Sequence, residues 1–127
     1  MSAKLVVDTS IWIHFFRGKK IPDFESALKD NRILTTPIVI AELLSGAKKP
    51  SEQDALVKLL SDIEICACSF DHWVRVGKLR SQLQKVGLTI STPDAHIAQC
   101  ALDYEAKILS EDKIFAQIGK AIKSAIS

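Results

Sequence analysis

Four short apolar runs alternate with longer segments of helical periodicity, and this alternation limits the fold more than any other feature of the sequence. Runs of this length and hydrophobicity are typical of buried parallel strands. Alternation with helical segments favours an α/β protein, in which helices cover a central, mostly parallel sheet. The predicted strands are Leu5–Asp8, Ile33–Thr35, Ile63–Cys66 and Lys107–Ser110.

Helix-starting and helix-ending residues mark the segments around these strands. Thr36 and Thr92 are each followed by proline, a combination of a cap residue with the preferred first helical residue. Gly87 stands where a long helix is expected to end. The tail 122–126 fits either an edge strand or a helix end. The predicted helices are Ser10–Arg17 with Ser10 as its cap, Pro22–Lys29, Pro37–Ala47, Ser51–Leu60, Ser69–Val86, Pro93–Tyr104 and Lys113–Ile118.

Length, charge and hydrophobicity limit the kinds of protein that this chain can be. The 127 residues suit one domain over 1–127 with a sizeable core. The net charge of +2 is too small to indicate nucleic-acid binding by itself. No apolar run approaches the roughly 18 residues that a membrane span needs, and the N-terminus does not resemble a signal peptide. We therefore expect a cytosolic protein that does not enter a membrane.

The spacing of the cysteines and histidines in the sequence does not predict a metal site. An odd number of cysteines without an export signal favours reduced thiols. Structural zinc typically needs about four ligands in paired clusters, and the histidines are scattered along the chain. We therefore do not expect structural zinc. The residues concerned are Cys66, Cys68 and Cys100, with the first two on one face of a predicted strand, and His14, His72 and His96.

Asp8 ends the first apolar run and is followed by two hydroxyl residues, Thr9 and Ser10. At the carboxyl end of a central parallel strand, it would lie where ligands and catalytic groups gather in open α/β sheets. It is also well placed to cap the helix that follows. Its role depends on whether other acidic residues reach the same edge.

Glu42 is an unusual residue for its helix, since the surrounding sequence is strongly apolar. Helical spacing places it on one face with Ile38 and Val39. An unpaired buried carboxylate would be costly there. Glu42 therefore either lies on a narrow exposed stripe or points into a cleft and meets a cation.

Asp94 and Asp112 each have a structural alternative as well. Both stand near predicted helix starts, where an acid favours the macrodipole or caps the helix. Asp94 also begins the apolar stripe of its own helix. Asp112 follows the last predicted strand by two residues, and its neighbour Glu111 is a candidate substitute.

One topology can bring Asp8, Glu42, Asp94 and Asp112 to the same end of a parallel sheet. Four carboxylates so close would repel one another and raise one another's pKa values. A hard divalent cation such as Mg²⁺ or Mn²⁺ would relieve this repulsion, since these ions prefer oxygen ligands. The hydroxyls of Thr9 and Ser10 could then hold a carboxylate or a water.

The ordered set of segments resembles the PIN-domain ribonucleases, and among them the VapC-type toxins of toxin–antitoxin pairs. The resemblance extends over nearly the whole chain. The sequence departs from the family pattern at Ser110, where threonine is frequent, and at Ile114, where a further aspartate is frequent. The matching segments are 6–10, 41–47, 93–98 and 109–112.

The resemblance implies a three-layer α/β/α sandwich and hydrolysis of RNA by metal-activated water. It implies a homodimer and an antitoxin whose C-terminal segment crosses the active groove. Asp8, Glu42 and Asp94 would hold the metal, and Asp112 would hold a second ion or orient the water. The supporting residues would be Thr9, Ser10 and Ser110 around the acids, and Arg17, Lys48 and Lys113 as cations that contact phosphate.

Two other functions remain open from the sequence. One is a PIN-like binding or regulatory module that no longer cuts RNA, although such a decayed site usually loses one or more acids. The other is a phospho-acceptor or phosphatase domain with Asp8 as the nucleophile. Asp8 is not followed by the second acid that such domains usually present. The aromatic residues Trp12, Phe15 and Phe16 could stack on RNA, but we expect at least two in the core or a dimer interface.

Overall fold

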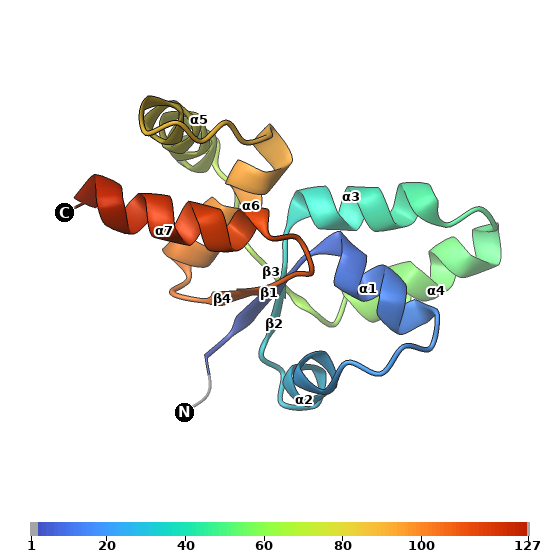
Figure 1. The fold of residues 1–127 in the computed structure, drawn as a ribbon. Helices are drawn as coiled ribbons and strands as arrows, with labels where there is room; N and C mark the ends of the chain where they lie inside the picture. Colours follow the sequence, from blue (N-terminus) through green and yellow to red (C-terminus); the bar gives the residue numbers. More distant parts are fainter. Residues whose placement is uncertain (1–2, 127) are drawn as a thin grey trace.

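Parallel pairing of short strands forms the centre of the protein in the computed structural model, which describes residues 3–126 and the side chains of 3–123 (Figure 1). The strands are β1 (Leu5–Val7), β2 (Ile33–Thr35), β3 (Glu64–Ile65) and β4 (Lys107–Leu109), in the sheet order β3-β2-β1-β4. Every pair in this sheet is parallel, with Val6 of β1 opposite Leu34 on one side and Ile108 on the other. The predicted α/β architecture is therefore confirmed.

Helices connect the strands and surround the sheet. In Figure 1, α5, α6 and α7 lie together on one side of the sheet, while α2 lies on the other. No helix of the described residues is both long and apolar enough to cross a membrane. The helices are α1 (Thr9–Phe16), α2 (Pro22–Lys29), α3 (Pro37–Gly46), α4 (Pro50–Leu60), α5 (Phe70–Lys85), α6 (Thr92–Asp103) and α7 (Ile114–Ile126).

The main core packs β1 and β2 against helices from both halves of the chain. Val6, Val7 and Leu34 are fully buried. Trp12 of α1 is also fully buried and meets Phe24 of α2 edge-on, with ring centroids 5.0 Å apart. Aromatic packing of this kind adds to the burial of apolar area. Trp12 is therefore a core residue and is not available to stack on RNA.

A second apolar cluster joins α5, α6 and α7. Ile118 of α7 is buried in it, and Ala121 and Ile122 pack against it at helical spacing. Residues 122–126 are therefore the end of one long helix, α7, which also includes the shorter helix predicted to end at Ile118. The sequence left the strand alternative open because the α5–α6 surface that buries these side chains is a tertiary feature.

Several predicted boundaries shift by a few residues because backbone hydrogen bonds decide them. Helix α1 begins at Thr9 with Asp8 as its cap, so the prediction of Ser10 as the cap is wrong. Helix α6 begins at Thr92, and Ser91 caps it by accepting from Asp94 N. Strand β3 is Glu64–Ile65, so the predictions that the strand includes Cys66 and that Cys66 and Cys68 share one of its faces are wrong.

Other predicted helix ends are confirmed. Thr36 caps α3, because its hydroxyl accepts a hydrogen bond from Val39 N at 3.3 Å. Gly87 follows α5 with a φ of 87°, a left-handed conformation that glycine adopts without the steric cost of a side chain.

We predict that Leu34→Ala strongly destabilises the protein. Leu34 is fully buried in the central strand β2, and removing a side chain at such a position costs about 2–5 kcal/mol through lost burial and the remaining cavity. Val57→Ala on the exposed face of α4 should change the free energy of unfolding by less than about 0.5 kcal/mol. Urea unfolding followed by circular dichroism measures both, and equal effects would contradict the assignment of the core.

Candidate functional site

Asp8 lies at the carboxyl edge of the sheet, between two neighbouring strands and the start of α1. Its Oδ1 accepts a hydrogen bond from Thr9 N at 2.8 Å. Its Oδ2 accepts from Ser110 Oγ at 2.8 Å and from Ser10 Oγ at 3.3 Å. Because β1 and β4 are parallel neighbours, the residues that follow each strand meet at this edge.

Ser110 connects Asp8 with Asp112. Its hydroxyl donates to Asp8 and accepts from Asp112 N at 3.0 Å. Asp112 Oδ1 in turn accepts from Ile114 N at 3.0 Å at the start of α7. Asp8 and Asp112 therefore both act as helix caps. Each carboxylate oxygen has more than one lone pair, so capping leaves further acceptor capacity for a cation.

Glu42 reaches the same region from α3. Thr9 Oγ1 donates to Glu42 Oε1 at 3.0 Å, which ties α3 to the residue after Asp8. Glu42 itself is exposed, while Val39 and Leu43 of the same helix are buried. Of the two alternatives for Glu42, the exposed stripe is therefore the one that the structure shows. Glu42 lies near Asp8 because it accepts a hydrogen bond from Thr9, the residue that follows Asp8.

Asp94 enters from the first turn of α6, a helix that contacts β1 and β4. Its side chain is partly buried, and this burial is the main cause of a raised pKa. The Ser91 hydroxyl counteracts the rise in the pKa, whereas the negative charges of Asp112 and Asp8 add to it. The repulsion indicates that the charges of Asp94, Asp8 and Asp112 act on one another across this edge.

Glu111 has different partners from the neighbouring Asp112. Its carboxylate contacts Lys19 Nζ at 2.9 Å and His14 Nδ1 at 3.0 Å. The hydrogen bond from Lys19 is the main cause of the lowered pKa of Glu111, and His14 lowers it further. Glu111 is thus paired with Lys19 and His14, which makes it a poor substitute for Asp112.

The three predicted phosphate-contacting cations are exposed. Arg17 follows α1, Lys48 follows α3 and Lys113 precedes α7. Within residues 3–123, whose side chains are described, these cations form no ion pair with the four acids of the edge. Hydroxyl and backbone N–H groups, rather than these side chains, therefore hold the acids.

The donor set at this edge is suited to a hard divalent cation. The groups available are carboxylate oxygens, and the pKa of Asp94 is raised mainly by burial, with a smaller contribution from the negative charges of Asp112 and Asp8. Mg²⁺ and Mn²⁺ prefer oxygen ligands and retain waters in addition to a few carboxylates. The residues that could hold such an ion are Asp8, Glu42, Asp94 and Asp112.

An apolar groove extends from this edge between α6, β4 and α7. Its volume is about 640 Å³, and its lining includes Ala98, Ile108 and Phe115. Ser110 and Asp112 also line it, so the groove reaches one of the four acids, Asp112.

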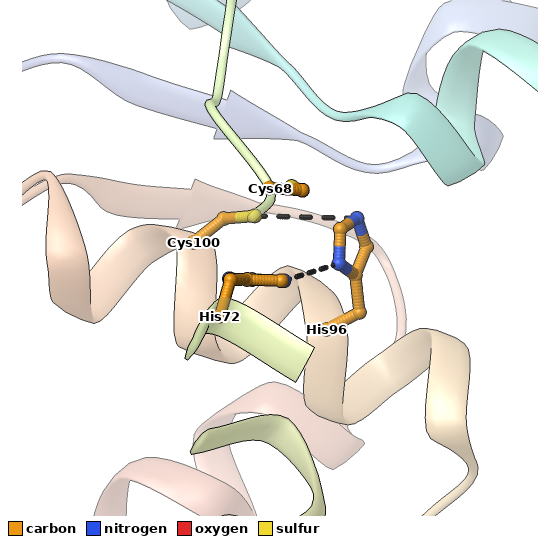
Figure 2. Close-up of side chains that lie close together, drawn as sticks. All are labelled: Cys68, His72, His96 and Cys100. Atoms are coloured by element: carbon orange, nitrogen blue, oxygen red, sulfur yellow. Dashed lines mark hydrogen bonds between the residues drawn. The ribbon is translucent and has the colours of Figure 1, made fainter. Parts of the chain in front are cut away.

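The structure also brings together four residues whose proximity was not predicted from the sequence. Cys68, His72, His96 and Cys100 place one potential ligand atom each within 4.8 Å of the others (Figure 2). The spacing in the sequence could have indicated this group, since each of these two cysteines stands four residues from a histidine. The view that the histidines are scattered is therefore wrong for His72 and His96, although His14 lies apart and contacts Glu111.

Comparisons with known proteins establish the family. The model of the PIN domain matches residues 5–121. Four parallel strands in the described chain, with acidic residues at their carboxyl edge, agree with that match. The chain belongs to the PIN-domain family, as the sequence motifs predicted.

Relatives of known name match along most of the chain. Ribonuclease VapC2 of Rickettsia felis is 32% identical over 127 residues, which covers 92% of this chain and 93% of the relative. Ribonuclease VapC5 of Mycobacterium tuberculosis is 26% identical over 122 residues, which covers 91% of this chain and 88% of the relative.

Solved structures give the same fold. A complex described as VapBC2 from Rickettsia felis bound to a promoter DNA fragment matches with a TM-score of 0.72 and 27% identity, over 90% of this chain and 92% of the other. A toxin–antitoxin complex from Klebsiella pneumoniae matches with a TM-score of 0.70 and 25% identity, over 88% of each chain.

We predict that Asp112→Asn lowers the pKa of Asp94 in the metal-free protein, because it removes a negative charge that raises this pKa. A carboxyl whose pKa is raised by folding stabilises the native state least when it is ionised. The contribution of Asp94 to stability therefore falls as the pH rises through its pKa. Carboxyl NMR titration measures the shift, with the distant exposed Asp62→Asn as control. An unchanged Asp94 pKa in Asp112→Asn would contradict the proximity of these acids.

Proposed function

We propose that this chain is a metal-dependent endoribonuclease and the toxin of a toxin–antitoxin pair. The observation that supports this most directly is the link of Asp8 to Asp112 through Ser110 and of Glu42 to Thr9 at one edge of a PIN-family sheet. Relatives over most of the chain carry the name ribonuclease. The family match to residues 5–121 also supports a single domain over 1–127.

In this proposal, Asp8, Glu42 and Asp94 hold Mg²⁺ or Mn²⁺, and Asp112 holds a second ion or orients the attacking water. The bound ion would lower the pKa of a water molecule and offset negative charge on the phosphate. No side-chain nucleophile is required. A hard ion fits because the donors are carboxylate oxygens whose mutual repulsion it relieves.

The chain's own hydroxyl groups would fix the geometry of these acids. Ser110 and Ser10 donate to Oδ2 of Asp8, and Thr9 donates to Glu42. Hydrogen bonds of this kind hold a ligating carboxylate in one orientation and so lower the reorganisation needed when an ion binds.

The exposed cations Arg17, Lys48 and Lys113 would contact the phosphates of an RNA strand that crosses the acidic edge. Contacts with phosphate position a nucleic acid without reading its sequence. Phe16 has 44% of its surface exposed and could stack on a base, whereas Trp12 is buried. An RNA substrate also implies that the protein acts in the cytoplasm.

The proposed protein partners are a cognate antitoxin and a second copy of this chain. Several structural relatives are described as toxin–antitoxin complexes, which supports the first partner. The apolar groove between α6, β4 and α7 would accept an antitoxin segment, and one that follows it would pass Ser110 and Asp112. Such a segment would cover the acidic residues and so inhibit cleavage.

We predict that the purified chain, freed from any antitoxin, cleaves RNA in the presence of Mg²⁺ or Mn²⁺ and stops in EDTA. Asp8→Asn should lower the rate by about 100-fold or more, as the loss of a group that stabilises transition-state charge does. Asp62→Asn makes the same change at an exposed acid far from the edge and should leave the rate unchanged. Gel analysis of labelled RNA measures this, and an active Asp8→Asn variant would sink the assignment. A folded wild-type protein that never cleaves would favour the inactive binding module.

Glu42→Gln separates a metal-binding role from a structural one. We expect the rate of cleavage to fall while the free energy of unfolding without metal stays level or rises, because one charge is removed from an acidic cluster. Glu52→Gln on α4 is the matched control and should retain full activity. Activity assays and urea unfolding measure the two effects. A marked loss of metal-free stability in Glu42→Gln would instead assign Glu42 a structural role.

A further inference from the structure

Two segments of the chain bring a pair of cysteines and a pair of histidines together at the α5–α6 contact. Cys68 stands just before Ser69, the cap of α5, and His72 lies in the first turn of that helix. His96 and Cys100 lie four residues apart on α6, so helical geometry places them on one face. Figure 2 shows the four side chains directed toward a common centre.

The group is almost closed to solvent. His72 and Cys100 are 1% exposed and His96 is fully buried, while Cys68 is partly exposed. The indole ring of Trp73 covers His96 in a stacked arrangement with ring centroids 4.8 Å apart. A neutral imidazole has a ring nitrogen with a free lone pair, which is the form in which histidine binds metal.

Hydrogen bonds within the protein satisfy this buried group only in part. The Cys68 thiol donates to Cys66 O at 3.4 Å, and the Cys100 thiol contacts the thiols of Cys66 and Cys68. The contact of His72 Nε2 with His96 Nδ1, at 2.8 Å, is a good hydrogen bond. Cys100 Sγ is 4.0 Å from His96 Nε2, the outer limit for sulfur. His72 Nδ1 is buried and has no hydrogen-bond partner among the described residues. A bound ion would give His96 Nε2 and the Cys100 thiol closer partners than this long contact provides.

We propose that Cys68, His72, His96 and Cys100 bind one Zn²⁺ ion in a structural site. Two thiolates and two imidazoles are a common ligand set for structural zinc. Tetrahedral coordination with Zn–S near 2.3 Å and Zn–N near 2.0 Å separates ligand atoms by about 3.3–3.8 Å. The present atoms all lie within 4.8 Å of one another, so small side-chain movements would complete the tetrahedron.

The charge balance of this site suits its burial. On binding, the thiols of Cys68 and Cys100 each release a proton to solvent and form a Zn–S bond, and the two imidazoles bind as neutral ligands. The charge of Zn²⁺ and the charges of two thiolates then cancel. A neutral centre can be buried without the large cost of an isolated charge.

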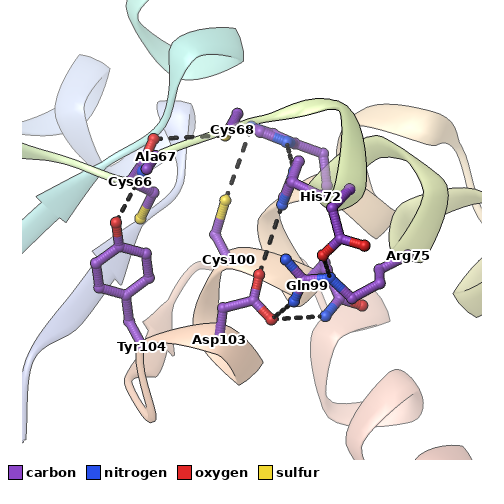
Figure 3. A network of polar contacts seen from close by, with 11 residues as sticks. Cys66, Ala67, Cys68, His72, Arg75, Gln99, Cys100, Asp103 and Tyr104 are labelled. Carbon is purple, nitrogen blue, oxygen red and sulfur yellow. Dashed lines mark hydrogen bonds and ion pairs between the residues drawn. The ribbon is translucent and has the colours of Figure 1, made fainter.

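Asp103 provides the outer support that zinc-binding histidines usually have. Its Oδ2 lies 3.6 Å from His72 Nδ1, the ring nitrogen that faces away from the other ligands (Figure 3). Arg75 and Gln99 hold the other carboxylate oxygen, Oδ1. At this distance the carboxylate does not yet accept a hydrogen bond from Nδ1. A small approach would let it do so, which would favour the tautomer with the proton on Nδ1 and leave Nε2 to bind metal.

This zinc site would be separate from the acidic edge. Asp94 and His96 are two residues apart on α6, so they point to different faces of the helix. The ligands differ as well, since thiolate and imidazole select zinc whereas carboxylates select magnesium or manganese. The bound zinc would join the segment after β3 and the start of α5 to α6, the helix that carries Asp94.

The test uses the full chain, purified under reducing conditions and analysed for metal by mass spectrometry. We expect close to one zinc ion per chain, retained by Asp8→Asn. When Co²⁺ replaces zinc in the presence of excess Mg²⁺, thiolate-to-cobalt charge-transfer absorption and strong tetrahedral bands should appear. Carboxylate-bound Co²⁺ would show neither, so this signal distinguishes the two sites.

Matched cysteine variants locate the ligands. Cys68→Ser should weaken zinc binding by about 100-fold or more and remove most of the charge-transfer absorption, because it deletes one of four ligands. Cys66→Ser makes the same change two residues earlier, at a buried thiol that contacts Cys100 but is not one of the four proposed ligands, and should retain both signals. Asp103→Asn should weaken zinc binding by about 10–100-fold while the cobalt spectrum keeps its form.

Two outcomes would overturn the proposal. One is reduced wild-type protein that gives no thiolate-to-cobalt absorption and binds zinc no more tightly than Cys68→Ser. The other is a Cys66→Ser variant that folds and loses as much zinc as Cys68→Ser. The wild-type titration decides the question even where a variant does not fold.

Discussion

The parallel pairing of β1 with β4 is the contact on which the acidic edge depends. It places the residues after both strands side by side, so Ser110 can donate to Asp8 while it accepts from Asp112. Asp8 N also donates to Leu109 O at 3.0 Å, which continues the pairing past the last strand residue. An antiparallel arrangement would send Asp8 and Ser110 to opposite ends of the sheet.

Helix α6 joins the two regions that carry the functional proposals. Its first turn brings Asp94 to the sheet edge, and its middle turns present His96 and Cys100 to the segment before α5. The helix is buried from Ala95 to Ala101, because it packs on the sheet and on α5 and α7. A buried helix of this kind can hold polar side chains only where partners satisfy them. The surroundings of Asp94 at one end and of His96 and Cys100 in the middle therefore indicate what these residues do.

Much of the fold follows from local signals. Apolar runs placed the strands to within about two residues at their ends, and the Thr36–Pro37 pair located the start of α3. The cap of α1 was misassigned, because Asp8 and Ser10 are both suitable cap residues and the backbone geometry selects Asp8. The structure of residues 122–126 was left open because the sequence does not show that Ile118, Ala121 and Ile122 pack together with residues of α5 and α6.

The sequence by itself determined the family, through the order of motifs around Asp8, Glu42, Asp94 and Asp112. It could not determine their environments, because exposure and hydrogen bonding arise between segments distant in the chain. Glu42 is exposed and held by Thr9, and Glu111 is paired with Lys19. The same reason explains why the sequence did not predict the proximity of Cys68, His72, His96 and Cys100. Their two short spacings are visible in the sequence, but only the packing of α5 against α6 brings the potential ligand atoms of the two pairs within 4.8 Å of one another.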